Sequence, residues 1–518
     1  MNTFKRKALF TAVVAGLGVA GNAEAVFLSP NHTGQVLVFP YYTVQSSSGN
    51  SWNTYISVVN TTTFAKAVKV RVLEGKTSAE VLDFNLFLSP NDVWTAAIIP
   101  GDNTATSPGK MVTADNSCTR PVGQLRTGGE PFRNYQYSVA GSADSLPGTD
   151  LARTREGYVE MLEMGTLSGA TATAITHNSA GIPANCGVVQ APAFTSIPAG
   201  QLNAPTGGLM GTGTLINVNS GRDAGYKADA LDAWRNASFY TDSGFVQPNL
   251  GDALPATSLV IRSGDIDGVT GAATMITAYR TDFATTSGVL AGSRAVASVF
   301  MHSAVMNEYV LDNASASLTD WVITQPLKNQ FVNDVTAAQP YTALLTATGA
   351  CEAIQFLSFN REEQGAVASG SDFSPLPPAG PASSLCWEST VLSIRNPAGP
   401  HMPTDTTVST VLGSKNLTNV NVTSGFQNGW SNLSFIGTNA SVPVGLSGAL
   451  ASSQHISLGT NAATMGAVTA GAVTFFGLPV TGFMVRTFSN NTLTCGTASC
   501  QGNYGSAFNH SYRTTVTP

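Results

Sequence analysis

Alternating apolar and charged residues between Lys66 and Leu73 constrain most strongly what this chain folds into. In an extended backbone successive side chains point to opposite faces, so Val68 and Val70 share one face while Lys69 and Arg71 share the other. This period of two predicts a half-buried β-strand.

Similar segments recur at short intervals on both sides of this strand. QVLVFPYYTV, NTYISVVN, VLDFNLFLS and VWTAAIIP are separated by the turn-forming stretches SSSGN, NTTT, GKTS and SPND. Short strands with turn signals between them are typical of β-sandwiches. We therefore predict a mainly β chain built of antiparallel, Ig-like β-sandwich units, with long loops and few short helices.

The same pattern suggests a division of the chain into units. We predict a signal peptide at 1–25, an N-terminal β-sandwich unit at 26–100, a loop-rich insertion at 101–150, a central β-rich unit with short helices at 151–345, and a C-terminal β-rich unit at 346–518.

Two segments carry a helical pattern or leave the choice open. Tyr226, Ala230 and Trp234 recur every fourth residue, which predicts a helix over 220–236. The apolar stretch 293–310 fits either a buried helix or a buried strand. The phrase FLSPN occurs twice, at Phe27–Asn31 and Phe87–Asn91, and both copies predict strand-end turns.

The N-terminus has the order of a secretory signal peptide. Lys5, Arg6 and Lys7 precede the apolar run 8–20, and Ala23-Glu24-Ala25 supplies the small residues of a cleavage site. Cleavage would remove three basic residues and one acidic residue, so the net charge of −6 would become −8. No later apolar run reaches the length of a membrane-spanning helix, so we expect no transmembrane segment in the mature chain.

Charge is scarce along the whole sequence. Charged residues make up 11% of the chain, against roughly 25% in ordinary soluble domains. Phosphate binding requires a basic face, and no cluster of Lys or Arg supplies one, so the sequence argues against a nucleic-acid partner. A surface with so little charge favours self-association or a place in the cell envelope.

Six cysteines in an exported chain favour disulfides over free thiols. Chain order favours three pairs among the fifteen connectivities: Cys118–Cys186, Cys351–Cys386 and Cys495–Cys500. No Cys-x-x-Cys-His motif occurs, which excludes a covalently attached c-type haem.

Two pairs of acidic residues invite a chemical interpretation. Asp265 and Asp267 in GDIDG resemble the start of a calcium loop, but the twelfth position is Ile276, where an EF-hand requires Glu. The pattern favours a hairpin turn, with calcium as the only cofactor that the sequence suggests. Glu160 and Glu163 would point to opposite faces of a strand, which argues against a glycosidase pair and for a solvated strand edge.

Other candidates have a simpler explanation in core packing. His302, flanked by Met301 and Met306, fits an apolar core segment better than a copper site. Tyr41, Tyr42 and Trp52 could form a sugar platform, although core packing is the default for such residues. The sequence contains no Gly-x-Ser-x-Gly, Walker or dinucleotide-binding motif.

Four phrases in the second half carry a family resemblance. TDWVITQP followed by LKNQF, the preceding MNEYV, GLPVTGF and NYGSAFNHSYR are similar to exported bacterial cell-surface proteins of unassigned function. The resemblance provides no catalytic residues. We therefore expect an exported, non-enzymatic structural or adhesive protein, located at the cell surface, outside the cell or in the periplasm. The alternative is a secreted carbohydrate-active or other hydrolytic enzyme with a site built from loops.

Overall fold

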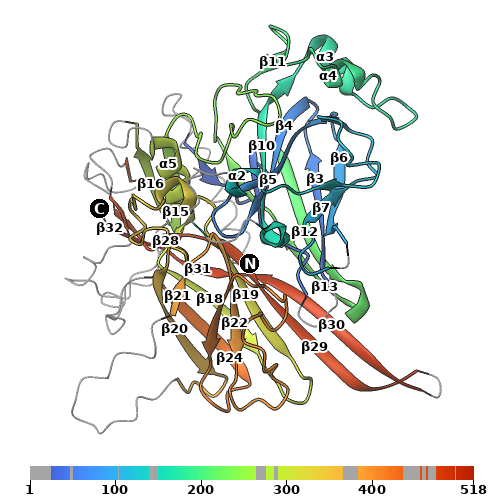
Figure 1. Ribbon diagram of the computed structural model, residues 1–518. Helices are drawn as coiled ribbons and strands as arrows, with labels where there is room; N and C mark the ends of the chain where they lie inside the picture. Colours follow the sequence, from blue (N-terminus) through green and yellow to red (C-terminus); the bar gives the residue numbers. More distant parts are fainter. Residues whose placement is uncertain are drawn as a thin grey trace, which may run out of the picture.

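The computed structural model describes residues 25–46, 51–102, 104–138, 146, 150–263, 276–284, 290–365, 383–435, 455–457, 463–464, 474–495 and 498–517. Residues 1–24 of the predicted signal peptide, which spans 1–25, lie outside them. The protein is mainly β, with several antiparallel sheets and few short helices, as the sequence predicts (Figure 1).

Two large sheets form an N-terminal sandwich. The first has the strand order β1 (Phe27–Leu28), β14 (Asp229–Asp232), β2 (Val36–Thr43), β10 (Glu156–Leu167), β4 (Ala65–Glu74), β5 (Glu80–Leu88) and β8 (Cys118–Arg120), and β11 (Leu202–Asn203) also pairs with β10. The second has the order β13 (Arg222–Lys227), β12 (Leu209–Asn217), β3 (Asn53–Asn60), β6 (Val93–Pro100), β7 (Gly109–Val112) and β9 (Glu130–Pro131). Strands from both sides of the 101–150 segment thus share the same sheets.

Strand β4 is the alternating segment that predicted a half-buried strand. The strand is present, but all ten of its residues are buried, so the expectation of a solvated charged face is wrong. Val68, Val70 and Val72 pack in the core between the two sheets. The opposite face is covered by the chain that follows β14, where the Asp242 carbonyl accepts a hydrogen bond from Lys69 at 3.4 Å. A period of two shows which residues share a face, and a covering segment far along the chain decides whether that face meets water.

Two five-stranded sheets form a second, C-terminal sandwich. One has the order β21 (Ser383–Leu385), β20 (Glu352–Asn360), β24 (Asn428–Ser434), β18 (Ala304–Val310) and β31 (Ser511–Arg513). The other has the order β23 (Leu417–Asn421), β22 (Ser389–Arg395), β19 (Leu318–Thr324), β29 (Thr481–Cys495) and β30 (Ala498–Asn509). Figure 1 shows β29 and β30 as a long hairpin that extends beyond this sandwich alongside β13. Gly505 permits the close approach, because a Cβ there would lie 2.3 Å from the Asp223 carbonyl oxygen.

Small sheets and short helices fill the space beside the sandwiches. The small sheets comprise β15 (Thr257–Ser263), β16 (Ile276–Asp282) and β26 (Ala463–Thr464); β17 (Met301–His302) and β28 (Leu478–Pro479); and β25 (His455–Ser457), β27 (Thr474–Phe476) and β32 (Thr515–Thr517). The helices are α2 (Tyr135–Ser138), α3 (Gly169–Ile175), α4 (Gly187–Gln190), α5 (Ala291–Phe300) and α6 (Lys328–Phe331), with 3₁₀ turns η1 (Leu151–Arg155) and η2 (Val218–Ser220).

The two segments with a helical or ambiguous pattern have different outcomes. The expected helix at 220–236 is wrong, because this stretch forms β13 and β14. Tyr226 and Ala230 are buried on these strands, where sheet pairing overrides a four-residue spacing. The ambiguous stretch 293–310 contains both a helix and strands, because helix α5 is followed by strands β17 and β18.

One loop connects the two sandwiches through buried hydrogen bonds. Asp320 of β19 accepts the backbone N–H groups of Val411 at 3.0 Å and Leu412 at 2.9 Å. Glu156 at the start of β10 accepts Ser414 Oγ at 2.5 Å and the Lys415 N–H at 2.9 Å. The loop is therefore held by a carboxylate of each sandwich, and Val411 and Leu412 pack in the N-terminal core.

Candidate functional site

The residues that the sequence singled out for metal binding and disulfides are only partly described. Asp265 and Asp267, the calcium candidates, lie outside the described residues. The structure contains the Cys118–Cys186 and Cys351–Cys386 disulfides, two of the three pairs expected from chain order. The side chains of Cys495 and Cys500 lie outside the described part of the chain.

Glu160 and Glu163 point to opposite faces of β10, as the sequence predicts for two residues three apart on a strand. The solvated edge expected for them is wrong, because β10 lies between β2 and β4 and both carboxylates are buried. Glu160 accepts a hydrogen bond from Arg71 at 2.6 Å, and Arg71 also binds Glu80 at 2.7 Å. Burial raises the pKa of Glu160, and the charge of Arg71 opposes that shift.

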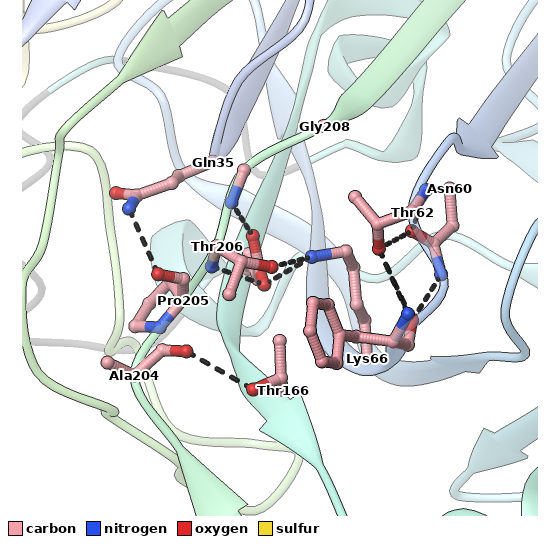
Figure 2. Close-up of polar contacts among 12 residues, drawn as sticks. Gln35, Asn60, Thr62, Lys66, Thr166, Ala204, Pro205, Thr206 and Gly208 are labelled. Carbon is pink, nitrogen blue, oxygen red and sulfur yellow. Dashed lines mark hydrogen bonds and ion pairs between the residues drawn. The ribbon is translucent and has the colours of Figure 1, made fainter.

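Glu163 forms a second buried pair with Lys66, at 2.6 Å. The same carboxylate accepts the backbone N–H groups of Thr206 at 3.0 Å and Gly207 at 2.8 Å. Lys66 also donates to Thr206 Oγ1 at 2.8 Å, and Figure 2 shows these two side chains reaching toward each other. Burial raises the pKa of Glu163 and lowers that of Lys66, and in each case the partner's charge opposes the shift. This pair fixes the loop that leads into β12.

The aromatic candidates belong to the core, and His302 is half-buried beside it. His302 stacks on Tyr512 with ring centroids 4.1 Å apart, and burial lowers its pKa to about 3. Tyr41, Tyr42 and Trp52 are almost completely buried, so no sugar platform exists at these residues.

An open pocket of about 440 Å³ lies at the end of the N-terminal sandwich, where three segments meet. The loop between β3 and β4 supplies Phe64, the turn after β5 supplies Pro90, and the chain at the end of α3 supplies Thr176 and His177. Ala65 and Leu167 are buried beneath it. Neutral side chains make up this lining apart from the titratable His177, a combination suited to binding a small ligand.

Ser89, His177 and Asp92 meet at this pocket in a way that resembles a hydrolase triad in composition only. Ser89 Oγ lies 2.6 Å from His177 Nδ1, and Asp92 Oδ2 lies 3.6 Å from the same nitrogen. In a catalytic relay the nucleophile and the carboxylate occupy different ring nitrogens. Ser89 is also buried and donates to the Ile175 carbonyl at 3.1 Å. The three residues therefore clamp the chain after α3 to the turn after β5.

Sequence reasoning missed this arrangement for a physical reason. Ser89 and His177 are 88 residues apart, and no short motif joins them. The available signal was the second FLSPN phrase, which contains Ser89. The structure confirms the turn predicted there, because β5 ends at Leu88 and Asn91 adopts a left-handed φ of 54°. The Cys118–Cys186 disulfide joins β8 to the segment that carries α4, on the same side of the sheet as the clamp.

Two further features are absent from the described residues. No group of three or more His, Cys, Asp or Glu side chains is arranged to hold a metal ion there. Among the helices of the described chain, none combines the length and the apolar character needed to cross a membrane.

Comparisons with protein-family models, with curated proteins and with solved structures found no match.

Proposed function

We propose that this chain is an exported, non-enzymatic protein that serves in the structure or adhesion of a bacterial cell surface. Two disulfides are consistent with an oxidising compartment outside the cytoplasm. The order of basic, apolar and small residues at the N-terminus supports export. The low charge of the chain supports association with other envelope components or with further copies.

The observation that carries the non-enzymatic proposal is the state of the open pocket. No Asp, Glu, Lys or Arg is among its lining residues, and the serine and carboxylate nearby share one nitrogen of His177. Such a pocket supplies contact area and hydrogen bonds without an activated nucleophile, which supports recognition over hydrolysis.

The junction between the sandwiches supports a structural role. Besides the loop held by Glu156 and Asp320, Tyr158 donates to the Pro326 carbonyl at 3.1 Å and Tyr226 stacks on Phe483 with centroids 4.5 Å apart. Buried polar and aromatic contacts of this kind resist relative movement of the two units. Two sandwiches joined in this way suit a protein that carries a binding surface away from the cell.

Location tests the proposal directly. Fractionation of the native host followed by immunoblotting should find the protein in the envelope or medium, and N-terminal sequencing should begin at Val26. Whole cells treated with a membrane-impermeant biotin reagent should label it. A cytoplasmic protein that retains Met1 would contradict the proposal.

The alternative, a secreted hydrolase, rests on the meeting of Ser89, His177 and Asp92 at the pocket. Purified protein should be assayed against a panel of ester and glycoside chromogens. Turnover that is lost in Ser89→Ala and kept in the matched surface variant Ser57→Ala would favour the hydrolase. No turnover above a buffer control is the result we expect.

A further inference from the structure

An exposed row of aromatic and charged side chains crosses the C-terminal sandwich, away from the pocket already described. Trp430 of β24 is directly opposite Phe359 of β20 on one side and Glu308 of β18 on the other. These three side chains share the outer face of one sheet, because directly paired residues in an antiparallel sheet point the same way.

The Trp430 indole is held in place and left open on one side. Its ring stacks on Phe359, with centroids 4.7 Å apart and planes 17° from parallel. Gly365 lies close against the Phe359 ring, since a Cβ added to this glycine would be 3.1 Å from the nearest ring carbon. Trp430 is nevertheless 44% exposed, an unusual degree for a tryptophan. Since Phe359 covers the side toward β20, the free side of the indole is turned toward Glu308.

Paired charges border that free side. Glu308 Oε2 lies 3.3 Å from Arg486 Nη1, and the Glu308 side chain is 68% exposed. Arg486 is fixed by a hydrogen bond to Ser506 Oγ at 3.2 Å and lies over the Phe508 ring, 4.6 Å from its centroid. The row therefore offers a flat apolar surface beside a carboxylate acceptor and a guanidinium donor.

We propose that Trp430, Glu308 and Arg486 form a binding platform for a neutral glycan. The apolar face of a pyranose ring stacks on an indole, while its equatorial hydroxyl groups donate to a carboxylate and accept from a guanidinium. The charge pattern selects this class of ligand. Arg486 repels a quaternary ammonium ion, which would otherwise suit Trp430, and Glu308 repels an anionic ligand.

The biological meaning of this platform rests on the proposed adhesive function, but its test does not. Purified full-length protein is titrated with cellohexaose, xylohexaose, chitohexaose and maltohexaose, followed by calorimetry and by tryptophan fluorescence. We expect at least one of the four to bind. Trp430→Ala should weaken that binding by about tenfold or more, the usual effect of truncating an aromatic anchor.

Matched variants separate the platform from general damage. Trp430→Phe keeps a stacking ring and should retain most of the affinity, whereas Arg486→Met should weaken binding while leaving the unfolding midpoint close to that of the wild type. Tyr55→Ala removes a comparably exposed aromatic on the other sandwich and should have no effect. Binding of none of the four oligosaccharides, or equal binding by Trp430→Ala and wild type, would overturn the inference. A cytoplasmic location with intact glycan binding would instead contradict only the proposed function.

Discussion

Lys66 and Glu163 form an ion pair of 2.6 Å inside the N-terminal sandwich, with neither side chain exposed to solvent. Removing two charges from water costs free energy. The attraction between the two charges offsets this cost only if further hydrogen bonds satisfy their remaining polar atoms. Here the Thr206 and Gly207 N–H groups and the Thr206 hydroxyl supply them. The pair therefore holds the loop before β12 in place.

Breaking this pair should be strongly destabilising. Lys66→Met leaves the Glu163 carboxylate buried without its cation, and we expect a loss of about 3 kcal/mol or more in the free energy of unfolding. Urea unfolding followed by tryptophan fluorescence measures it. The control is Arg361→Met, which removes the solvent-exposed pair with Glu362 and should change stability by about 0.5 kcal/mol or less. Similar losses in the two variants would contradict this account.

How far the sequence predicts the structure differs between strands and sites. The period of two in β4 correctly predicts a strand and its valine face, because the pleat of a strand is a local property. That Lys69 and Arg71 are buried depends on a covering segment more than 160 residues away, near Asp242. The Trp430 platform likewise joins β18, β20, β24 and β29, so no local pattern contains it.

The arrangement of side chains at the His177 pocket likewise could not be predicted from local sequence. A triad composition arises from residues distant in sequence, and only the distances show that Ser89 and Asp92 compete for one nitrogen. The two described disulfides were more predictable, because neighbouring cysteines in the chain close the shortest loops.

Asp229 gives a first pH dependence. It is half-buried at the junction with β29, where the Thr481 hydroxyl donates to it, and desolvation raises its pKa to about 6. The folded protein therefore binds more protons than the unfolded chain between about pH 4 and pH 6, and this contribution to stability is lost as the pH rises through that window. Asp229→Asn should remove the effect and raise the unfolding free energy at pH 7 by about 3 kcal/mol. Equal stability of the variant and wild type at both pH 4 and pH 7 would contradict the assignment.

His510 gives a dependence of the opposite sign. Its Nε2 lies 3.0 Å from the Val322 carbonyl and its Nδ1 lies 3.0 Å from the Asn307 amide nitrogen. The Nε2–H donates and Nδ1 accepts, so both nitrogens are satisfied in the neutral ring. Burial lowers the pKa of His510 to about 4.

The consequence is a loss of stability in mild acid. The unfolded chain binds the extra proton between about pH 6.5 and pH 4, so stability falls as the pH is lowered through this range, by about 3 kcal/mol for this group. Unfolding in the Asp229→Asn background isolates the histidine contribution. Adding His510→Gln should reduce the remaining dependence without abolishing it, because His302, whose pKa is lowered in the same direction, contributes the rest. A slope unchanged by His510→Gln would show that other groups carry it.

The last prediction concerns the Cys118–Cys186 disulfide, which closes a loop with a sequence separation of 68. Replacing both residues by Ala releases that constraint on the unfolded chain, and we expect a loss of about 4 kcal/mol in the chain-entropy treatment. The folded protein should also loosen locally, because the segment that carries α4 then depends on weaker contacts such as the 2.8 Å hydrogen bond from Arg120 to the Ala191 carbonyl.

Cys351→Ala with Cys386→Ala is the matched control, since that bridge closes a loop with a separation of 35 in the other sandwich. Chain entropy predicts a cost only about 0.6 kcal/mol smaller, so stability alone separates the variants poorly. The place of cleavage separates them well. Limited proteolysis of the native proteins should cut between 176 and 201 only in the first variant, because only there does the bridge hold the chain beside His177. Identical cleavage patterns, or protection of that segment in the absence of its disulfide, would show that the hydrogen bonds alone hold this segment in place.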